Sequence, residues 1–371
     1  MKIRLEASPL ATTNLTGVGN YTKLLSEALY RNNSVELEMT NFNFLNRQPS
    51  PITNTKIKSI ENHLIPLKVY AKLQSYNLAP QFDFFKKPVD LTIFTNYATW
   101  PTVKSKLTAV VIHDLTFLHF PEVMEEKNLA HLKRVVPRAL KKTDIILTVS
   151  QTIKNEIVNE YGVDPEKIIV TTIPPADFFS VKNETDVIEY YDIKTKKYIY
   201  TIGTIEPRKD IPTLVKAYTL LPKKIKAEYS LVIAGGMGWK SEESKKSIDD
   251  AIKNGENIKY LGYIDQKMSN ALHQQASLHV SASTYEGFGM PALESIAGGT
   301  MTVLSDIPVY HEVGGNISLF AKPKDSLDFA HKIEEALTNK KHVDYFSKNY
   351  QKHLDSFSWE KNIKNILQKI N

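Results

Sequence analysis

Cysteine is absent from the 371-residue chain, which excludes disulfides, thiolate metal sites and a cysteine nucleophile. Glycine and proline are not enriched, at 15 and 18 residues, so neither a fibrous nor a disordered chain is favoured. No stretch approaches the roughly 20 apolar residues that span a bilayer. The opening Lys-Ile-Arg-Leu-Glu-Ala run alternates like a strand, whereas a signal peptide would carry an apolar block there. We therefore expect a cytoplasmic protein that is not integral to a membrane.

The chain is long and basic. One hydrophobic core rarely grows beyond roughly 250–300 residues, so two domains are expected. The formal charge of +6 and the pI of about 9.0 favour anionic partners such as phosphates or acidic lipid surfaces, although many basic proteins of this size bind nothing acidic. The basic residues do not interleave with aromatic residues in a nucleic-acid-binding motif, so we expect no nucleic-acid partner.

Short β-rich runs alternate with amphipathic helical runs along both halves of the chain. This order is typical of parallel sheets with crossover helices. Strands are expected at 2–7, 35–42, 91–94, 108–112, 144–149, 168–173, 198–202, 229–234, 258–261, 277–281 and 301–304. Helices are expected at 18–31, 124–142, 151–161, 210–221, 241–253, 266–275, 291–297 and 326–338. The fold class is therefore α/β, with two Rossmann-like parallel-sheet domains.

The domain boundary is expected between Pro174 and Lys197, where a stretch of mixed charge precedes a fresh strand. We accordingly assign residues 1–180 to the first domain and 190–355 to the second. Residues 43–90 are poorly patterned, with prolines and aromatic residues between them. A long irregular insertion of this kind is usually either functional or flexible.

Ligands of open parallel sheets bind at the carboxyl ends of the strands. In the first half of the chain, two groups of residues suited to ligand binding follow strands. The run Thr16-Gly17-Val-Gly19-Asn20 follows the first strand; its glycines and the following helix N-terminus suit an anion. An ordinary glycine turn is the alternative. His113 closes the strand 108–112 and could hydrogen-bond a sugar hydroxyl. A structural histidine is the alternative there.

The second half has a basic group after the strand 198–202. Gly203 opens this loop, and Arg208 and Lys209 stand together just before the next helix. Adjacent guanidinium and ammonium groups suit a diphosphate. A solvated basic loop is the alternative interpretation.

The segment from Glu286 to Glu294, which reads Glu-Gly-Phe-Gly-Met-Pro-Ala-Leu-Glu, follows the strand 277–281. Its glycines and Pro291 prevent the two carboxylates from sharing one helix, so Glu286 is expected in the loop and Glu294 on the first turn of the next helix. Between them, the N–H groups of Gly289, Met290, Ala292 and Leu293 would form an anion site at a helix N-terminus. Two surface glutamates around a turn are the alternative.

Together these blocks resemble glycosyltransferase family four, retaining enzymes of the GT-B fold, in which two Rossmann-like domains face a central cleft. The resemblance covers most of the chain. It is carried by the runs Thr16-Gly-Val-Gly-Asn20-Tyr21, Val111-Ile-His113-Asp114-Leu115, Leu147-Thr-Val-Ser150, Ile202-Gly-Thr-Ile-Glu206-Pro-Arg208-Lys209-Asp210, Leu231-Val-Ile-Ala-Gly235, Leu261-Gly262-Tyr263 and Glu286–Glu294. A terminal helix at about 357–371 is expected to cross back onto the first domain. The first block most resembles mannosyl- and rhamnosyltransferases of polysaccharide assembly, although Glu6 stands where relatives often carry Asp, and Asn20 where an Arg is common.

The resemblance implies a role for each matching residue. The Gly17–Gly19 amides, Arg208 and Lys209 would hold the donor diphosphate, with Gly203 opening the same loop. His113 would contact the transferred sugar, and Glu286 would bind its hydroxyls. The backbone of Phe288, Gly289 and Met290, with the Leu293 amide, would lie under the sugar and phosphate. Glu294 would bind the ribose, and Tyr263 would lie near the base.

The resemblance also implies the reaction: a metal-independent, retaining transfer of a hexose, with no cofactor. GDP-mannose is the favoured donor, and a UDP- or dTDP-sugar is the alternative. The acceptor would be a glycan or a polyprenyl-linked molecule. Two other functions stay open, namely a different nucleotide-sugar enzyme of the GT-B fold, such as an epimerase, and a non-catalytic protein that binds a glycan or polyanion.

Two basic segments of the first half could dock at an anionic membrane, which would place the protein peripherally on the inner face of the cell membrane. The expected helix 124–142 carries Lys133, Arg134, Arg138, Lys141 and Lys142. Residues 69–88 mix Tyr70, Tyr76, Phe82, Phe84 and Phe85 with lysines. A helix that packs on the core and solvates its basic face is the alternative.

Overall fold

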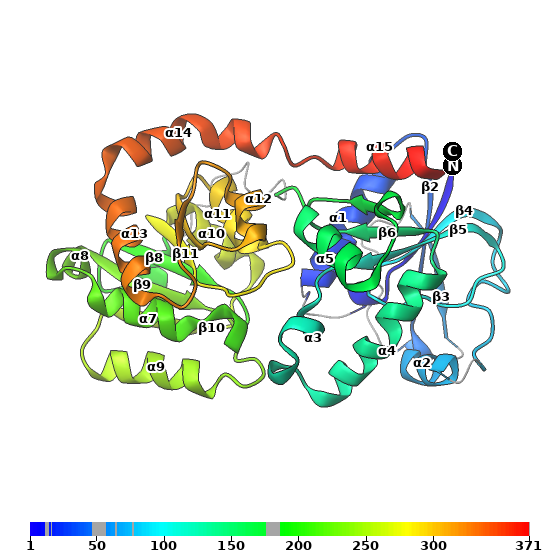
Figure 1. Cartoon of the computed structure of the whole chain (residues 1–371), viewed down its shortest axis with the longest axis horizontal. Coiled ribbons are helices and arrows are strands. Elements are labelled where there is room, and N and C mark those ends of the chain that lie inside the picture. The colour runs from blue at the N-terminus through cyan, green and yellow to red at the C-terminus, as the bar shows by residue number, and fades with distance from the viewer. Residues whose placement is uncertain are drawn as a thin grey trace. The chain divides into compact units, whose positions relative to one another are not determined.

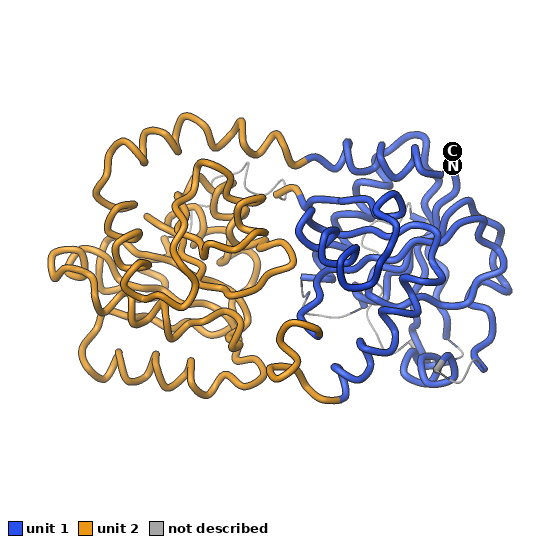
Figure 2. The backbone as a smooth tube through the Cα atoms, viewed as in Figure 1, with its two compact units in different colours: residues 1–117, 127–173, 358–371 blue, residues 118–126, 174–357 orange. Residues whose placement is uncertain are grey.

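The computed structural model (Figure 1) describes residues 1–11, 15, 17–46, 57–63, 65–75, 78–175 and 186–370. The expectations that involve Thr16 and Tyr76 lie outside these residues. The chain divides into two compact units, coloured separately in Figure 2. Unit 1 comprises Met1–Phe117, Lys127–Ile173 and Ser358–Asn371, and unit 2 comprises Leu118–Glu126 and Pro174–Phe357.

Unit 1 is built on a sheet of seven strands in the order β3-β2-β1-β4-β5-β6-β7. All its described pairs are parallel. The strands are β1 (Lys2–Glu6), β2 (Glu36–Phe42), β3 (Lys58–Asn62), β4 (Val89–Phe94), β5 (Ser105–Ile112), β6 (Ile145–Thr148) and β7 (Ile168–Val170). The helices are α1 (Gly17–Arg31), α2 (Leu67–Ser75), α3 (Thr116–His119), α4 (Glu126–Lys142), α5 (Gln151–Tyr161) and α15 (Trp359–Ile370).

The carboxyl-terminal helix α15 packs within unit 1, although α1 and β7 lie far from it in the sequence. The Asn362 amide donates to the Thr172 carbonyl at 2.6 Å. The Trp359 ring lies 5.7 Å from the ring of Tyr21 on α1. The last helix thus completes the same unit that the first strand begins.

Unit 2 is built on a parallel sheet of six strands in the order β10-β9-β8-β11-β12-β13. The strands are β8 (Lys197–Ile202), β9 (Tyr229–Ala234), β10 (Ile258–Gly262), β11 (Leu278–Ser281), β12 (Thr302–Ser305) and β13 (Leu319–Ala321). The helices are α6 (Val187–Tyr190), α7 (Ile211–Leu220), α8 (Lys223–Glu228), α9 (Glu242–Lys253), α10 (Gln266–Gln275), α11 (Met290–Ala297), α12 (Pro308–Gly314), α13 (Ser326–Thr338) and α14 (Lys340–Leu354).

Strand β9 shows how the unit 2 sheet is buried on both faces. All six of its residues are buried, as expected for a central parallel strand. Successive side chains point to opposite faces: Leu231 and Ile233 join the core that includes α7, α9 and α13. Val232 and Ala234 join the core that includes α6 and α10.

The expected α/β class with two parallel sheets is confirmed. Each strand expected from the pattern is present, with ends shifted by up to three residues. Two strands, β3 and β13, and several helices, including α2 and α14, were not expected. Strand β3 and α2 fall in the stretch that had been interpreted as irregular. No described helix is long and apolar enough to span a bilayer.

Candidate active site

Each sheet has one place where the strand order reverses direction. In unit 1 this switch point lies between β1 and β4, and in unit 2 between β8 and β11. The connections from two such strands diverge to opposite faces and leave a crevice at the carboxyl ends, where ligands of this architecture bind. Three of the groups singled out from the sequence follow strands at these switch points: Gly17–Gly19 after β1, Gly203–Lys209 after β8, and Glu286 after β11. His113 follows β5, the neighbour of β4.

The carboxylate of Glu286 is the centre of a buried charged cluster in unit 2. It is 7% exposed. Its Oε2 accepts a hydrogen bond from Arg208 Nη1 at 2.7 Å, and its Oε1 accepts from Lys209 Nζ at 2.5 Å. Ser283 Oγ also donates to Oε1, at 2.8 Å. The structure therefore brings Arg208 and Lys209 into contact with Glu286, although they precede it by 78 and 77 positions in the sequence.

The ionisation of Glu286 follows from this cluster. Burial by itself would raise the pKa of the carboxyl group, but the charges and hydrogen bonds of Arg208 and Lys209 outweigh it and lower the pKa to about 2. Opposite charges at hydrogen-bond distance favour the ionised form more strongly than burial disfavours it here. Glu286 is thus a permanent hydrogen-bond acceptor at neutral pH, not a proton donor.

Arg208 and Lys209 make further contacts besides those with Glu286. Arg208 Nε pairs with Glu206 Oε1 at 2.5 Å, and the Thr284 amide donates to the Arg208 carbonyl at 2.7 Å. Gly203 has φ +149°, and a Cβ there would approach the Lys209 side chain to 3.2 Å. The sequence pattern missed Glu206 as a partner, although it stands two positions before Arg208.

A left-handed glycine starts the helix that follows Glu286. Gly289 is the N-cap of α11 with φ +88°, a conformation that residues with a Cβ rarely adopt. A Cβ at this position would lie 2.5 Å from Tyr310 Cε1. The amides of Ala292 and Leu293 donate to the Gly289 carbonyl at 3.1 and 3.4 Å, so these two amides already have an acceptor. Met290 is partly buried and begins the helix.

Glu294 lies one turn into α11, as the position of Pro291 predicts, and it has a histidine partner that the sequence did not reveal. Its Oε2 lies 3.4 Å from Nε2 of the fully buried His273 on α10. His273 Nδ1 makes a 2.7 Å hydrogen bond with the Ser295 hydroxyl. The imidazole therefore hydrogen-bonds Ser295 and lies close to Glu294, two neighbouring residues of one helix.

Phe288 and Tyr263 occupy contrasting environments. Phe288 is 4% exposed and packs against Phe357, with ring centroids 6.1 Å apart. Tyr263 is 64% exposed and directly follows β10, which is the outer neighbour of β9. Gly262, with φ +67°, turns the chain there, and its carbonyl accepts from Gly235 N at 2.7 Å. Tyr263 follows β10, and Phe288 lies between β11 and α11. Both residues are thus in loops of unit 2 that follow strands, as is the charged cluster.

In unit 1, His113 is buried and held in a defined tautomer. Its Nε2 lies 2.8 Å from the Thr95 carbonyl oxygen, which can only accept, so Nε2 carries the proton. Burial lowers the pKa of His113, against the opposing effect of that hydrogen bond, so the ring is neutral at pH 7. Tyr21 and Tyr97 contact it edge-on, with centroids 5.1 and 5.6 Å away. The remaining nitrogen, Nδ1, is a hydrogen-bond acceptor.

The glycine loop of unit 1 opens α1, which begins at Gly17. Gly17 is exposed, and a Cβ there would meet nothing within 4 Å. Gly19 is buried, and a Cβ there would lie 3.0 Å from Leu15 Cδ2 and 3.1 Å from the Pro9 carbonyl. Close packing thus explains Gly19 but not Gly17.

Comparisons with known proteins agree with this architecture. The family model of the glycosyl transferases group 1 matches residues 184–353, which covers most of unit 2. The O-antigen chain mannosyltransferase B of Escherichia coli is 28% identical over 251 residues, which are 67% of this chain and 66% of that protein. The O-antigen chain mannosyltransferase RfbU of Salmonella typhimurium strain LT2 is 27% identical over 75% of this chain and 72% of its own length.

The fold is shared with solved structures at lower identity. Sucrose-phosphate synthase from Thermosynechococcus elongatus superposes with a TM-score of 0.72 at 17% identity, over 99% of this chain and 97% of that one. The two parallel sheets and this superposition show a GT-B fold. Within it, residues 184–353 are similar to the glycosyl transferases group 1.

Proposed function

We propose that the protein is a retaining hexosyltransferase that moves a sugar from a nucleoside diphosphate to a glycan or lipid-linked acceptor. The buried cluster of Glu286, Arg208 and Lys209 supports this proposal most directly. Two fixed cations beside a permanently ionised carboxylate offer charge for a diphosphate and an acceptor for sugar hydroxyls in one place. The cluster lies at the switch point of unit 2, where this architecture binds nucleotides.

The chemistry assigned to the cluster is stabilisation of a leaving group. The bond between the sugar C1 and the phosphate oxygen breaks, and its electron pair leaves with the nucleoside diphosphate. Arg208 and Lys209 stabilise the negative charge that develops there, which is typically the largest catalytic contribution. The acceptor oxygen bonds to C1 on the same face, and its proton passes to the departing phosphate. Glu286 holds the sugar hydroxyls and does not exchange a proton, because its pKa of about 2 keeps it ionised.

The same proposal gives roles to Glu294 and His113. Glu294, whose carboxylate lies 3.4 Å from His273 Nε2, accepts hydrogen bonds from the two ribose hydroxyls. His113 accepts a sugar hydroxyl at Nδ1, since Nε2 is committed to Thr95. The names of the two relatives favour mannose as the transferred sugar, and we propose GDP-mannose as the donor, with no cofactor or metal required.

The proposal is tested first by nucleotide binding. In a thermal-shift panel of GDP, UDP, dTDP and ADP, one nucleotide is expected to raise the unfolding temperature most, because a ligand of the native state stabilises it by about 2.7 kcal/mol at 100 times its Kd. We expect GDP to be that ligand. If none of the four raises it, the proposal is wrong.

Transfer itself is tested with two substitutions. Glu286→Gln and Arg208→Ala are each expected to lower kcat by roughly 10²–10³-fold, the usual effect of removing one group that stabilises transition-state charge. Lys245→Ala is the control, since Lys245 is an exposed lysine of unit 2 that pairs only with Asp249 on its own helix. Near-native rates in both site variants, with circular dichroism unchanged, would contradict the assignment.

We further propose that unit 1 docks on an anionic membrane, where a lipid-linked acceptor resides. Several large apolar side chains of unit 1 are strongly exposed, among them Val69 (48%), Leu78 (70%), Phe84 (60%), Phe85 (93%) and Val103 (58%). The rings of Phe84 and Phe85 pack against each other at 5.0 Å. Exposed lysines flank them at Lys68, Lys72, Lys87 and Lys104. Aromatic side chains beside lysines are typical of proteins that bind the interface of acidic membranes.

Vesicle co-sedimentation tests the docking. Phe84→Ser/Phe85→Ser is expected to lower binding to vesicles with phosphatidylglycerol several-fold, with little binding of either protein to pure phosphatidylcholine. Val343→Ser/Tyr345→Ser is the control, because these side chains are exposed on α14 in unit 2, at 41% and 44%. Equal binding of all three proteins to acidic vesicles would exclude the docking surface.

A further inference from the structure

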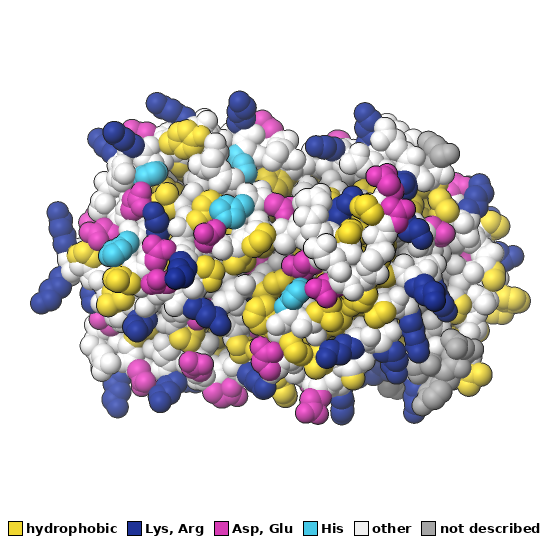
Figure 3. All heavy atoms as spheres, in the orientation of Figure 1, with side chains coloured by type: hydrophobic (Ala, Val, Ile, Leu, Met, Phe, Trp, Pro, Cys, Tyr) yellow, Lys and Arg dark blue, Asp and Glu magenta, His cyan; other side chains and the backbone are white. Residues whose placement is uncertain are grey.

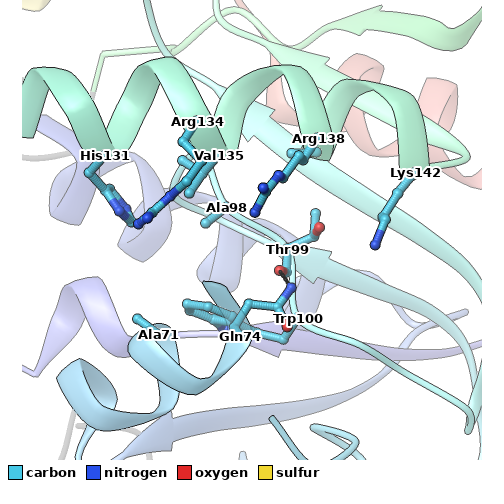
Figure 4. A pocket seen from close by; sticks show the side chains of 11 residues that line it. Ala71, Gln74, Ala98, Thr99, Trp100, His131, Arg134, Val135, Arg138 and Lys142 are labelled. Atoms are coloured by element: carbon cyan, nitrogen blue, oxygen red, sulfur yellow. Dashed lines mark hydrogen bonds between the residues drawn. The ribbon is translucent and has the colours of Figure 1, made fainter. Parts of the chain in front are cut away.

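A pocket in unit 1 lies apart from every residue discussed so far as part of the site. Its lining comes from α2, from the loop after β4 and from α4 (Figure 4): Ala71, Gln74, Ala98, Thr99, Trp100, His131, Arg134, Val135, Arg138, Ala139 and Lys142. No lining residue is acidic.

The basic side of the pocket is a single stripe of α4. His131, Arg134, Arg138 and Lys142 point from the helix toward the opposite wall (Figure 4). Residues three and four positions apart lie on one helix face, so this alignment follows from their spacing. Figure 3 shows several Lys and Arg side chains over α4. Like charges at such spacing destabilise a helix unless an anion lies between them.

The cations of this stripe have no anionic partner in the described part of the chain, where no ion pair or hydrogen bond involves the side chains of Arg134, Arg138 or Lys142. The cluster at Glu286 differs, because there each cation is ion-paired with a carboxylate. The charge of the pocket is therefore available to a ligand. Guanidinium groups match the oxygens of a phosphate.

The opposite wall is neutral and fixed. Trp100 packs edge-on against Tyr70 at 5.4 Å and Phe42 at 6.2 Å. Gln74 Nε2 lies 3.5 Å from the Thr99 carbonyl (Figure 4), which links α2 to the loop after β4. Such a wall presents polar atoms and an aromatic edge without adding charge. It would suit the part of a ligand that adjoins its anionic group.

The loop after β4 also connects the pocket to the site in unit 1. It begins at Thr95, whose carbonyl holds His113, and it reaches the pocket at Ala98. Strand β4 is one of the two strands at the switch point of unit 1, and the loop that follows it lines the pocket.

We propose that this pocket binds a phosphate or diphosphate group, and that in the reaction this group belongs to the acceptor. The second half of this statement rests on the proposed function; the first half does not. The arginines bind the phosphate oxygens, and Lys142 adds a third positive charge at the far end of the stripe. The acceptor would thereby be anchored by its anionic end in unit 1 while a hydroxyl is presented for transfer.

Calorimetric titration with pyrophosphate tests the site, with GDP present in excess to fill the donor site. The native protein is expected to bind pyrophosphate under these conditions. Arg134→Gln/Arg138→Gln is expected to weaken this binding by roughly tenfold or more, since a charged hydrogen bond accounts for about one power of ten in affinity. The matched control is Lys133→Gln/Lys141→Gln, which removes the same charge from exposed residues of α4 that do not line the pocket.

The outcomes separate the possibilities. No pyrophosphate binding, or an equal loss in both double variants, overturns the proposal. If GDP itself does not bind, the proposed function fails, but the same comparison without GDP still decides whether the pocket binds phosphate. An independent readout is the NMR titration of His131, whose pKa is lowered by burial and by Arg134. Its pKa is expected to rise when pyrophosphate binds in the native protein and not in the arginine variant.

The source of the phosphate is distinguished by two further ligands. A sugar 1-phosphate represents a soluble acceptor, and a short prenyl diphosphate in solution represents a lipid-linked one. The one that binds more tightly than pyrophosphate, with the same dependence on Arg134 and Arg138, identifies the class of acceptor. If neither ligand shows that dependence, the assignment of the pocket to the acceptor is wrong.

Discussion

Single carboxylates acquire opposite properties in the two units because their surroundings differ. Glu286 is surrounded by cations that lower its pKa to about 2. Glu6, at the end of β1, is buried, and burial raises its pKa to about 7, although hydrogen bonds from Ser8 and the charge of Lys86 act in the other direction. Residue type and position in the sequence are similar in the two cases, since both glutamates follow or end a buried strand at a switch point. The neighbours decide the charge.

The raised pKa of Glu6 predicts a pH dependence of stability. Because the folded form holds the proton more tightly than the unfolded chain does, the stability from this group is fully present below pH 4.5 and is lost as pH rises through about 7. Each unit of pKa difference corresponds to about 1.4 kcal/mol. Glu6→Gln is expected to remove this fall in the free energy of unfolding, measured with urea between pH 5 and 8 (roughly the titration range of the group). Glu36→Gln, at the exposed start of β2, should leave the fall unchanged.

Gly289 is a position where only glycine fits. Gly289→Ala places a Cβ against Tyr310 at a left-handed φ, and such strain costs about 1–3 kcal/mol. We expect a loss of that size in thermal unfolding, together with weaker nucleotide binding, because α11 would begin differently. Gly236→Ala is the comparison, since a Cβ there meets nothing within 4 Å. A Gly289 variant as stable and as tight in binding as the Gly236 variant would contradict this interpretation.

Among the secondary-structure elements, those with strong periodicity were predictable and those with weak local signals were not. Helix α10 (Gln266–Gln275) matches its expected bounds because Asp265 caps it and apolar residues recur along it. Strand β13, with three residues, and β3, at the outer edge of its sheet, carry too few apolar positions to stand out. Strand β13 pairs with β12, and β3 pairs with β2. These pairings supply the backbone hydrogen bonds of both strands, and the local sequence does not predict them.

Helix α15 yields a prediction because its role depends on contacts with remote residues. Ile366 is fully buried in unit 1, so Ile366→Ala is expected to lower the free energy of unfolding by about 2–5 kcal/mol. Lys364→Ala, on the exposed side of the same helix, should change it by no more than about 0.5 kcal/mol. Chemical denaturation measures both. Similar small effects of the two substitutions would show that α15 does not stabilise unit 1.

For the whole molecule, the two units are expected to contribute different groups to nucleotide binding. Hydrogen exchange can measure the two contributions separately. GDP is expected to slow the exchange of amides at 203–210 and 286–294 in unit 2, where the charged cluster and the start of α11 lie. The resemblance of the glycine loop implies that amides at 17–20 of unit 1 are slowed as well. Helix α14 and the edge strand β3 serve as internal controls. Uniform slowing throughout the chain, or none at 203–210, would contradict a donor site at the end of β8.

The sequence alone determined the α/β class, the division into two parallel-sheet units and the strand-end positions of Arg208, Lys209, Glu286 and His113. It could do so because strands, helices and glycine turns have local signatures. Only the tertiary structure decided that Glu286 is ion-paired with Arg208 and Lys209, that His273 lies beside Glu294, and that Arg134 and Arg138 line a pocket with α2. Each of these facts joins segments far apart in the sequence, and the charge state of a buried group depends on neighbours that chain order does not reveal.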